Sequence, residues 1–119
     1  MLYFATHHLG THTGVAVTGS HNPPDYNGLK MMIAGDTLSG EAIQNLRARI
    51  ERSDLASGTG AISHADVRGP YLDRIVADIR LGRRLRIAID CGNGVAGELA
   101  PQLFRRLGCE VTELFCQVD

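Results

Sequence analysis

The residues with the clearest potential for chemistry lie between Thr18 and Lys30, in the run TGSHNPPDYNGLK. This run places a serine hydroxyl (Ser20), an imidazole (His21) and a lysine ammonium (Lys30) within a short stretch of chain. A serine is a weak nucleophile and needs a base, a cation or a metal beside it. His21 and Lys30 are the neighbours that could supply this help. Ser20 is therefore a candidate for carrying a phosphoryl group.

The elements around Ser20 are predicted to hold it rigidly. A β-branched run predicts a strand over 14–18, and functional side chains in layered α/β folds lie at such strand ends. The two prolines of the motif keep the backbone after the serine extended and stiff. The following turn contains Gly28, which is free to take a positive φ, and residues 29–33 are predicted to form a returning strand. We therefore expect Ser20 and Lys30 to face one site.

These residue types alone leave the reaction open. A serine and a histidine are neighbours by chance in many chains, and a Pro-Pro turn with Asn-Gly is often only a tight surface loop. A hydrolase triad is disfavoured because adjacent residues at a strand end point apart. The Gly-x-Ser-x-Gly elbow of such enzymes is also absent from the sequence.

The run TGSHNPPDYNGLK resembles the phosphoserine loop of the α-D-phosphohexomutases, most closely the bacterial phosphomannomutase/phosphoglucomutase branch. The likeness covers essentially the whole chain, through YFATHHLGTHTGVAV before the motif and LRIAIDCGNGVAGELAPQLFRRLGCEVTELFCQVD after it. The Thr-Gly-Ser and Pro-Pro variants resemble the mannose and glucose enzymes more than the phosphoglucosamine mutases.

The resemblance implies an enzyme that interconverts hexose 1-phosphate and hexose 6-phosphate, of mannose and/or glucose, through a phosphoserine and a hexose 1,6-bisphosphate. Ser20 matches the serine that carries the phosphate, which also ligates Mg²⁺, and His21 matches the histidine beside it. Lys30 matches the lysine near the transferring phosphate. A phosphoryl transition state spreads negative charge over its oxygens, which explains a lysine and a metal around one serine. The full-length family member is expected to be a monomer.

The sequence also departs from the family. Its 119 residues suffice for about one ordinary domain, whereas the family has four. The family's metal loop is an Asp-Gly-Asp-Gly-Asp run, and the aspartates of this chain never cluster. We therefore expect a truncated chain that is inactive alone, with 1–69 as the C-terminal part of domain 1, 70–84 as a linker helix and 85–119 as the start of domain 2. The alternative from another class is a non-catalytic remnant.

The expected fold class is α/β, a partial mixed-sheet layered domain followed by the first βαβ unit of a second, similar domain. A helix capped by Ser39 is predicted to run to about Arg52, with an apolar stripe of Ile43, Leu46 and Ile50. A second helix is predicted to open at Pro70, with Leu72, Ile75, Val76 and Ile79 as its apolar stripe. A buried strand over 85–91, a helix over 98–107 and a strand over 109–115 predict a parallel pair with a right-handed crossover.

The run Gly92-Asn93-Gly94-Val95-Ala96-Gly97 has the spacing of a dinucleotide fingerprint and lies between a predicted strand and helix. A dinucleotide-binding βαβ module is thus an alternative. The fingerprint requires an acid at the end of the second strand, and here that strand runs into Phe115 and Cys116. Asp90 would also place negative charge near a pyrophosphate. A tight turn and close helix–strand packing are the favoured roles of these glycines.

Three histidines near the N-terminus, His7, His8 and His12, could suggest a metal cluster. Gly10 and Gly14 argue against a stable helix there, and no cysteine or carboxylate completes a tetrahedral set. Polar or partly buried histidines near a strand are the favoured interpretation.

Composition sets bounds on partners and location. A net charge of −1 with interspersed signs offers no basic footprint for nucleic acid. The apolar stretch at the N-terminus is too short for a signal peptide, because polar residues follow it closely. The sequence also has no apolar run long enough to span a membrane, so we expect no membrane partner. The cysteines are odd in number, namely Cys91, Cys109 and Cys116, and this predicts reduced, mostly buried thiols and a cytoplasmic location.

Overall fold

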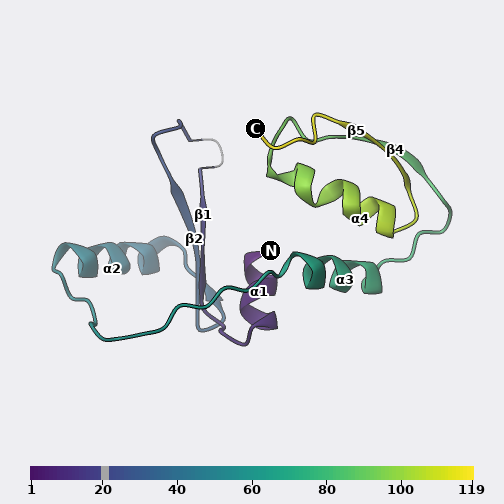
Figure 1. Ribbon diagram of the computed structural model, residues 1–119. Helices are drawn as coiled ribbons and strands as arrows, with labels where there is room; N and C mark the ends of the chain where they lie inside the picture. Colours follow the sequence, from purple (N-terminus) through teal and green to yellow (C-terminus); the bar gives the residue numbers. More distant parts are fainter. Residues whose placement is uncertain (20–21) are drawn as a thin grey trace. The chain divides into compact units, whose positions relative to one another are not determined.

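The computed structural model describes residues 1–19 and 22–119. The chain divides into two compact units, Met1–His64 and Ala65–Asp119. The first contains α1 (Leu2–His8), β1 (Gly14–Thr18), β2 (Gly28–Ile33), β3 (Asp36–Thr37) and α2 (Gly40–Glu51). The second contains α3 (Arg68–Asp78), β4 (Arg86–Asp90), the 3₁₀ helix η1 (Val95–Glu98), α4 (Ala100–Arg106) and β5 (Glu110–Leu114) (Figure 1). The predicted α/β class is confirmed; the domain boundaries stay a prediction.

The first unit is built on an antiparallel hairpin of β1 and β2. Its register pairs Gly14 with Met32 at one end and Thr18 with Gly28 at the other. The two residues of β3 extend the sheet on the far side of β2. The predicted strand over 14–18 is confirmed with both ends in place, and the returning strand begins one residue earlier than predicted.

One face of this hairpin is covered by α1. Met32 and Thr6 are the most buried side chains of the unit, each 3% exposed, and the Thr6 hydroxyl donates to the Tyr3 carbonyl oxygen at 3.0 Å. A Cβ at Gly14 would lie 2.6 Å from Thr6 Cγ2, so the strand approaches the helix closely. Successive side chains alternate between the faces of a strand. Val17, 69% exposed, accordingly lies on the open face.

The expectation that glycines prevent a helix near the N-terminal histidines is wrong for His7 and His8, which lie in α1. Gly10 has a φ of +67° and donates its N–H to the His7 carbonyl oxygen. A left-handed glycine of this kind ends a helix that has already formed. Only His12 lies beyond the helix.

The helix α2 follows Ser39 as predicted, but the Ser39 side chain makes no capping hydrogen bond. The predicted apolar stripe is not buried: Ile43 is 38% and Ile50 is 56% exposed, and only Leu46 is partly covered. The stripe is exposed because no element packs closely on it among the described residues. Residues 54–67 contain neither helix nor strand.

The second unit contains a parallel pair, β4 and β5, in register from Arg86 opposite Glu110 to Asp90 opposite Leu114. The predicted parallel pairing is confirmed. The strand at 86–90 is not fully buried as predicted, because its residues alternate between exposed and half-buried. The helix α4 packs on β5 and α3 packs on α4, so the sheet within this unit has one covered face.

Two further boundaries differ from the prediction. The helix α3 begins at Arg68, and Pro70 occupies its first turn, where a missing N–H removes no helical hydrogen bond. The helix predicted from Glu98 is preceded by the 3₁₀ turn η1, and α4 proper begins at Ala100. The buried side chains of this unit are Leu72, Cys109 and Pro101. No helix in the described part of the chain is long and apolar enough to cross a membrane.

Candidate functional site

The loop that joins β1 and β2 contains the sequence motif. Ser20 and His21, the predicted phosphate carrier and its neighbour, lie outside the described residues. Two backbone hydrogen bonds join described residues of the loop: the Asn22 backbone N–H donates to the Gly19 carbonyl oxygen at 2.8 Å, and the Tyr26 backbone N–H donates to the Pro23 carbonyl oxygen at 2.9 Å. These bonds lie within the loop, and its ends are held together by the pairing of Thr18 with Gly28.

Because it has no side chain, Gly28 lets the two strands approach closely at the end of the loop. A Cβ at this position would lie 2.6 Å from the Thr18 carbonyl oxygen and 3.7 Å from Asn22 Nδ2. Gly28 does not use the positive φ that is open to a glycine, because the residue already belongs to β2. The need for glycine comes instead from the close approach of the two strand backbones.

Lys30 lies on β2, is exposed, and is paired with Ala16. Side chains of alternate residues share a face of a strand, so Lys30 is on the same face as Thr18 and Gly28. Two residues of rise, about 6–7 Å, separate it from the strand pair at which the loop begins. A lysine side chain can span this distance. The structure thus places Lys30 at the central pair of the hairpin, on the strand face that also contains Thr18, and the predicted meeting of Ser20 with Lys30 stays a prediction.

The glycines between Gly92 and Gly97 in the second unit make close contacts within the fold. The Asp90 carboxylate accepts the Gly92 N–H at 2.9 Å, and Gly92 has a φ of +51°. A Cβ at Gly97 would lie 2.1 Å from the Cys116 carbonyl oxygen. The turn and packing roles predicted for these glycines are therefore confirmed.

The N-terminal histidines do not form a metal site in the structure. Within 1–19 and 22–119, no three histidine, cysteine or carboxylate side chains group so as to hold a metal ion. The His8 ring stacks on Phe4 with centroids 5.1 Å apart, and the rings of His7 and His12 meet edge to face at 5.6 Å. These imidazoles contact aromatic rings on the surface of the unit.

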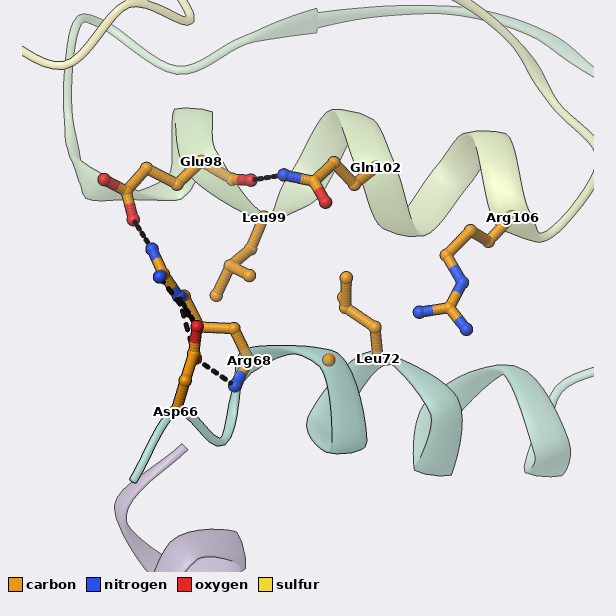
Figure 2. A pocket seen from close by; sticks show the side chains of 8 residues that line it. Asp66, Arg68, Leu72, Glu98, Leu99, Gln102 and Arg106 are labelled. Atoms are coloured by element: carbon orange, nitrogen blue, oxygen red, sulfur yellow. Dashed lines mark hydrogen bonds and ion pairs between the residues drawn. The ribbon is translucent and has the colours of Figure 1, made fainter. Parts of the chain in front are cut away.

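A cavity of about 530 Å³ lies in the second unit, lined by α3, by α4 and by the residues just before each helix (Figure 2). Its basic side chains are already paired with carboxylates. Arg68 contacts Asp66 at 2.8 Å and Glu98 at 3.5 Å, and Arg106 pairs with Asp73. The cavity therefore offers little uncompensated positive charge for a phosphate.

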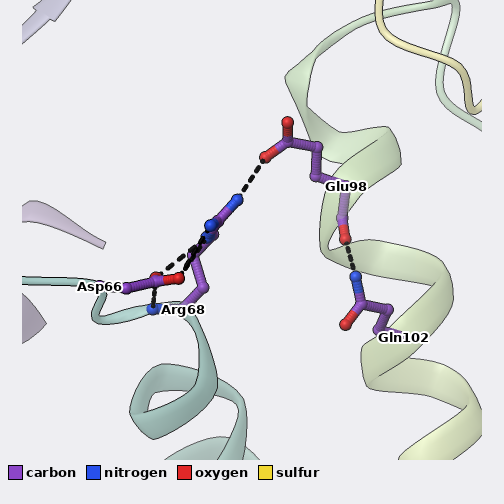
Figure 3. A network of polar contacts seen from close by, with 4 residues as sticks. All are labelled: Asp66, Arg68, Glu98 and Gln102. Atoms are coloured by element: carbon purple, nitrogen blue, oxygen red, sulfur yellow. Dashed lines mark hydrogen bonds and ion pairs between the residues drawn. The ribbon is translucent and has the colours of Figure 1, made fainter.

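The Asp66–Arg68–Glu98 network was not predicted from the sequence (Figure 3). Asp66 accepts the backbone N–H of Arg68 at 3.0 Å as well as its guanidinium. These hydrogen bonds lower the pKa of Asp66 from 3.8 to about 2. The spacing Asp-x-Arg before a helix is the signal that could have indicated it. We assign this network a structural role at the start of α3.

The comparisons with known proteins agree with the family resemblance of the loop motif. Residues 1–57 match the family model of phosphoglucomutase/phosphomannomutase, alpha/beta/alpha domain I. The whole chain is 51% identical to a phosphomannomutase/phosphoglucomutase of Pseudomonas aeruginosa and 54% identical to a phosphoglucomutase of Neisseria gonorrhoeae, covering 26% of each. A probable phosphoglucosamine mutase of Methanobrevibacter smithii is 34% identical over 98% of the chain and 27% of its own length.

A solved structure gives the same result. The crystal structure of a phosphoglucomutase/phosphomannomutase family protein from Burkholderia thailandensis matches with a TM-score of 0.84 and 50% identity. The match covers 90% of this chain and 23% of that one. The chain spans about a quarter of the length of the curated relatives it matches. With this sequence identity along its whole length and the same local fold, the chain belongs to the phosphoglucomutase/phosphomannomutase family.

Proposed function

We propose that this chain contributes the phosphoserine segment of a phosphohexomutase that interconverts hexose 1-phosphate and hexose 6-phosphate. The observation that carries the proposal is the identity of 51% over all 119 residues to a protein named phosphomannomutase/phosphoglucomutase. The run TGSHNPPDYNGLK lies within that matched length. The substrates are mannose and/or glucose phosphates, with a hexose 1,6-bisphosphate as the intermediate.

In the proposed reaction, Ser20 carries the phosphoryl group. A sugar hydroxyl attacks the phosphorus, the bond from phosphorus to the serine oxygen breaks, and a new bond to the sugar oxygen forms. The attacking hydroxyl loses its proton, and the serine oxygen takes up a proton to become a hydroxyl again. After the bisphosphate turns round, the other phosphate returns to Ser20.

The described geometry supports this role through Lys30. Negative charge spreads over the phosphoryl oxygens in the transition state, so a fixed cation nearby lowers the barrier. Lys30 is exposed at the central pair of the hairpin, and a lysine side chain is long enough to span the two residues between it and the strand end where the loop begins. His21, next to Ser20 in sequence, is proposed as a further polar contact of the phosphate.

The residues that the structure describes do not by themselves fit a magnesium ion. A hard cation of this kind prefers oxygen ligands from one or two carboxylates together with substrate phosphate. The phosphate on Ser20 would supply one ligand, but the described residues contain no group of three metal-ligating side chains. The aspartates of the sequence are also scattered.

A segment exchange tests the proposal. Residues 1–119 replace the matched segment of the Pseudomonas aeruginosa relative, and turnover of mannose 1-phosphate is measured with Mg²⁺ and a hexose bisphosphate activator. We expect the chimera to be active and to hold a phosphoryl group on the peptide that contains Ser20. Ser20→Ala should lower kcat on the order of a thousandfold or more, as loss of a nucleophile does in other enzymes.

The control is Ser57→Ala, which changes an exposed serine in the irregular segment 54–67. It should leave turnover and phosphorylation unchanged. Normal turnover by the Ser20→Ala chimera would refute the assignment of the phosphate carrier. A folded but inactive chimera with an intact Ser20 would contradict the proposed function of the segment.

A further inference from the structure

Two of the three cysteines lie next to each other in the second unit. The sulfur atoms of Cys91 and Cys116 are 3.5 Å apart, although the residues are 25 positions apart in the sequence. Cys91 directly follows β4, and Cys116 lies two residues after β5. Both side chains are half-buried, whereas Cys109, directly before β5, is 7% exposed. All three thiols are free in the structure.

Backbone hydrogen bonds hold this pair together from both sides. The Cys91 N–H donates to the Leu114 carbonyl oxygen at 3.1 Å, which continues the ladder of the parallel strands. One turn later, the Asn93 N–H donates to the Phe115 carbonyl oxygen at 2.7 Å, and Asn93 Nδ2 donates to the Gln117 carbonyl oxygen at 2.7 Å. The two cysteine backbones are therefore fixed relative to each other.

Two backbone features direct Cys116 toward Cys91. Phe115 has a φ of +50°, which is uncommon for a residue with a side chain and bends the chain directly before Cys116. Gly97 then lets η1 approach the Cys116 carbonyl, since any Cβ there would overlap with it. The pairing of the sulfurs is thus a consequence of the local fold rather than of flexible side chains alone.

A small reagent has access to the pair. A cavity of about 370 Å³ is lined by Asn93, Glu113, Phe115, Cys116 and Gln117. Cys116 is half-buried beside it, with its sulfur in contact with the Leu114 carbonyl oxygen at 3.4 Å. Hydrogen peroxide or a small disulfide can therefore approach one sulfur while the other lies within reach behind it.

We propose that Cys91 and Cys116 form a dithiol site that closes reversibly to an intrachain disulfide when a peroxide or a small disulfide oxidises it. With hydrogen peroxide, one thiol loses its proton, its thiolate attacks a peroxide oxygen and the O–O bond breaks, so that a sulfenic acid and hydroxide form and the hydroxide takes up that proton to become water. The second thiol attacks the sulfenic sulfur and expels a second water. Two thiols lose two electrons and two protons, and the peroxide is reduced. The sulfurs must approach from 3.5 Å to about 2.05 Å, which side-chain rotation can provide.

Oxidation that begins at Cys91 is expected to be slow near neutral pH. Partial burial, and then the adjacent Cys116 thiol, raise the pKa of Cys91 above its ordinary value, and the Asp90 and Glu113 carboxylates act in the same direction. Because the thiolate is the nucleophile, the rate of oxidation at Cys91 should rise with pH well into the alkaline range.

The test compares which disulfide forms in the folded and in the unfolded chain. Purified chain is treated with hydrogen peroxide in native buffer and in urea, free thiols are alkylated, and disulfide-linked peptides are identified by mass spectrometry. In urea, the shorter loop between Cys109 and Cys116 should be favoured by its lower closure entropy. In native buffer, the bond from Cys91 to Cys116 should dominate and should be removed by dithiothreitol.

Three variants sharpen the result. Cys109→Ala removes the cysteine that shares a tryptic peptide with Cys116, so the remaining cross-link is unambiguous, and oxidation should proceed as before. Cys91→Ser and Cys116→Ser should each abolish the native cross-link. The same mixture of disulfides in native buffer as in urea, or only disulfides between chains, would overturn the proposal. Oxidation of Cys91 to a sulfinic acid without a cross-link would also overturn it.

Discussion

A Cβ added to Gly97 would lie 2.1 Å from the carbonyl oxygen of Cys116 and 3.0 Å from its Cα. Cβ atoms do not approach backbone atoms this closely, so an alanine here must push η1 away from the segment after β5. Both contact atoms belong to the backbone, which yields less readily than the end of a side chain. The close approach explains why a glycine follows the turn at this point of the βαβ unit.

Gly97→Ala should therefore destabilise the second unit by about 3 kcal/mol, the upper part of the usual range for overpacking. It should also slow the formation of the disulfide from Cys91 to Cys116, because the strain falls on the backbone that positions Cys116. Urea unfolding followed by circular dichroism measures the first effect, and the cross-linking assay measures the second.

Gly69→Ala is the matched control for this change. Gly69 lies in α3 of the same unit, and a Cβ there would meet nothing within 4 Å. Alanine has the higher helix propensity, so this variant should be neutral or more stable by up to about 1 kcal/mol. Equal unfolding midpoints for the two variants would show that the contact with Cys116 does not constrain the fold.

Leu72 should be the most sensitive apolar position of α3. It is 3% exposed, whereas Ile79, at the end of the same predicted stripe, is 41% exposed. Leu72→Ala should cost about 2–3 kcal/mol, near the low end for a buried leucine, because Leu72 already borders a cavity. Ile79→Ala should cost less than about 1 kcal/mol. The free energy of unfolding of the two variants decides the ranking, and a reversed order would contradict it.

Local patterns in the sequence predicted the elements that position the candidate site. The strand over 14–18 was predicted with the correct ends because glycines bound a β-branched run. The parallel pair followed from two apolar runs separated by a helical pattern. The loop motif itself identified the family, and that identification did not depend on any tertiary contact.

Features that depend on tertiary contacts were not predictable in the same way. The stripe on α2 has helical spacing, but spacing does not tell whether another element covers it. The distance between Cys91 and Cys116 depends on the strand register and on the left-handed Phe115, neither of which has a sequence signal. The requirement for glycine at Gly28 likewise arises from the Thr18 carbonyl across the hairpin.

Gly28 links the fold of the hairpin to the proposed chemistry. In the chimeric enzyme, Gly28→Ala should displace the start of β2 from Thr18, and the loop that contains Ser20 should move with it. A misplacement of about 1 Å near reacting groups can lower the rate a hundredfold, so we expect kcat to fall on the order of tenfold to a hundredfold. Mutase turnover with mannose 1-phosphate measures this loss.

Gly58→Ala provides the comparison, because a Cβ there would meet nothing within 4 Å. Its chimera should retain full activity. Circular dichroism shows whether the Gly28→Ala chimera is still folded. A folded Gly28→Ala chimera with unchanged kcat would show that the close strand approach does not position the loop.

The purified chain alone should have no mutase turnover with mannose 1-phosphate, Mg²⁺ and a hexose bisphosphate. The reason is the metal site: the described residues contain no group of three ligating side chains, and a transferable phosphate needs charge neutralisation. The active chimera serves as the positive control under the same conditions. Measurable conversion to the 6-phosphate by the isolated chain would refute this prediction.

The Asp66–Arg68 pair should make the second unit sensitive to acid. The pKa of Asp66 is lowered from 3.8 to about 2 in the folded chain, first by its hydrogen bonds to the Arg68 side chain and backbone. The unfolded state therefore binds this proton more tightly than the folded state. The stabilisation is fully present above pH 3.8 and is lost as the pH falls toward 2.

Asp66→Asn keeps an oxygen that accepts the Arg68 N–H but removes the titrating charge, so the stability of this variant should fall less steeply between pH 4 and pH 2. Thermal unfolding of both proteins across this range measures the difference, and parallel curves would show that the ion pair does not contribute to acid sensitivity.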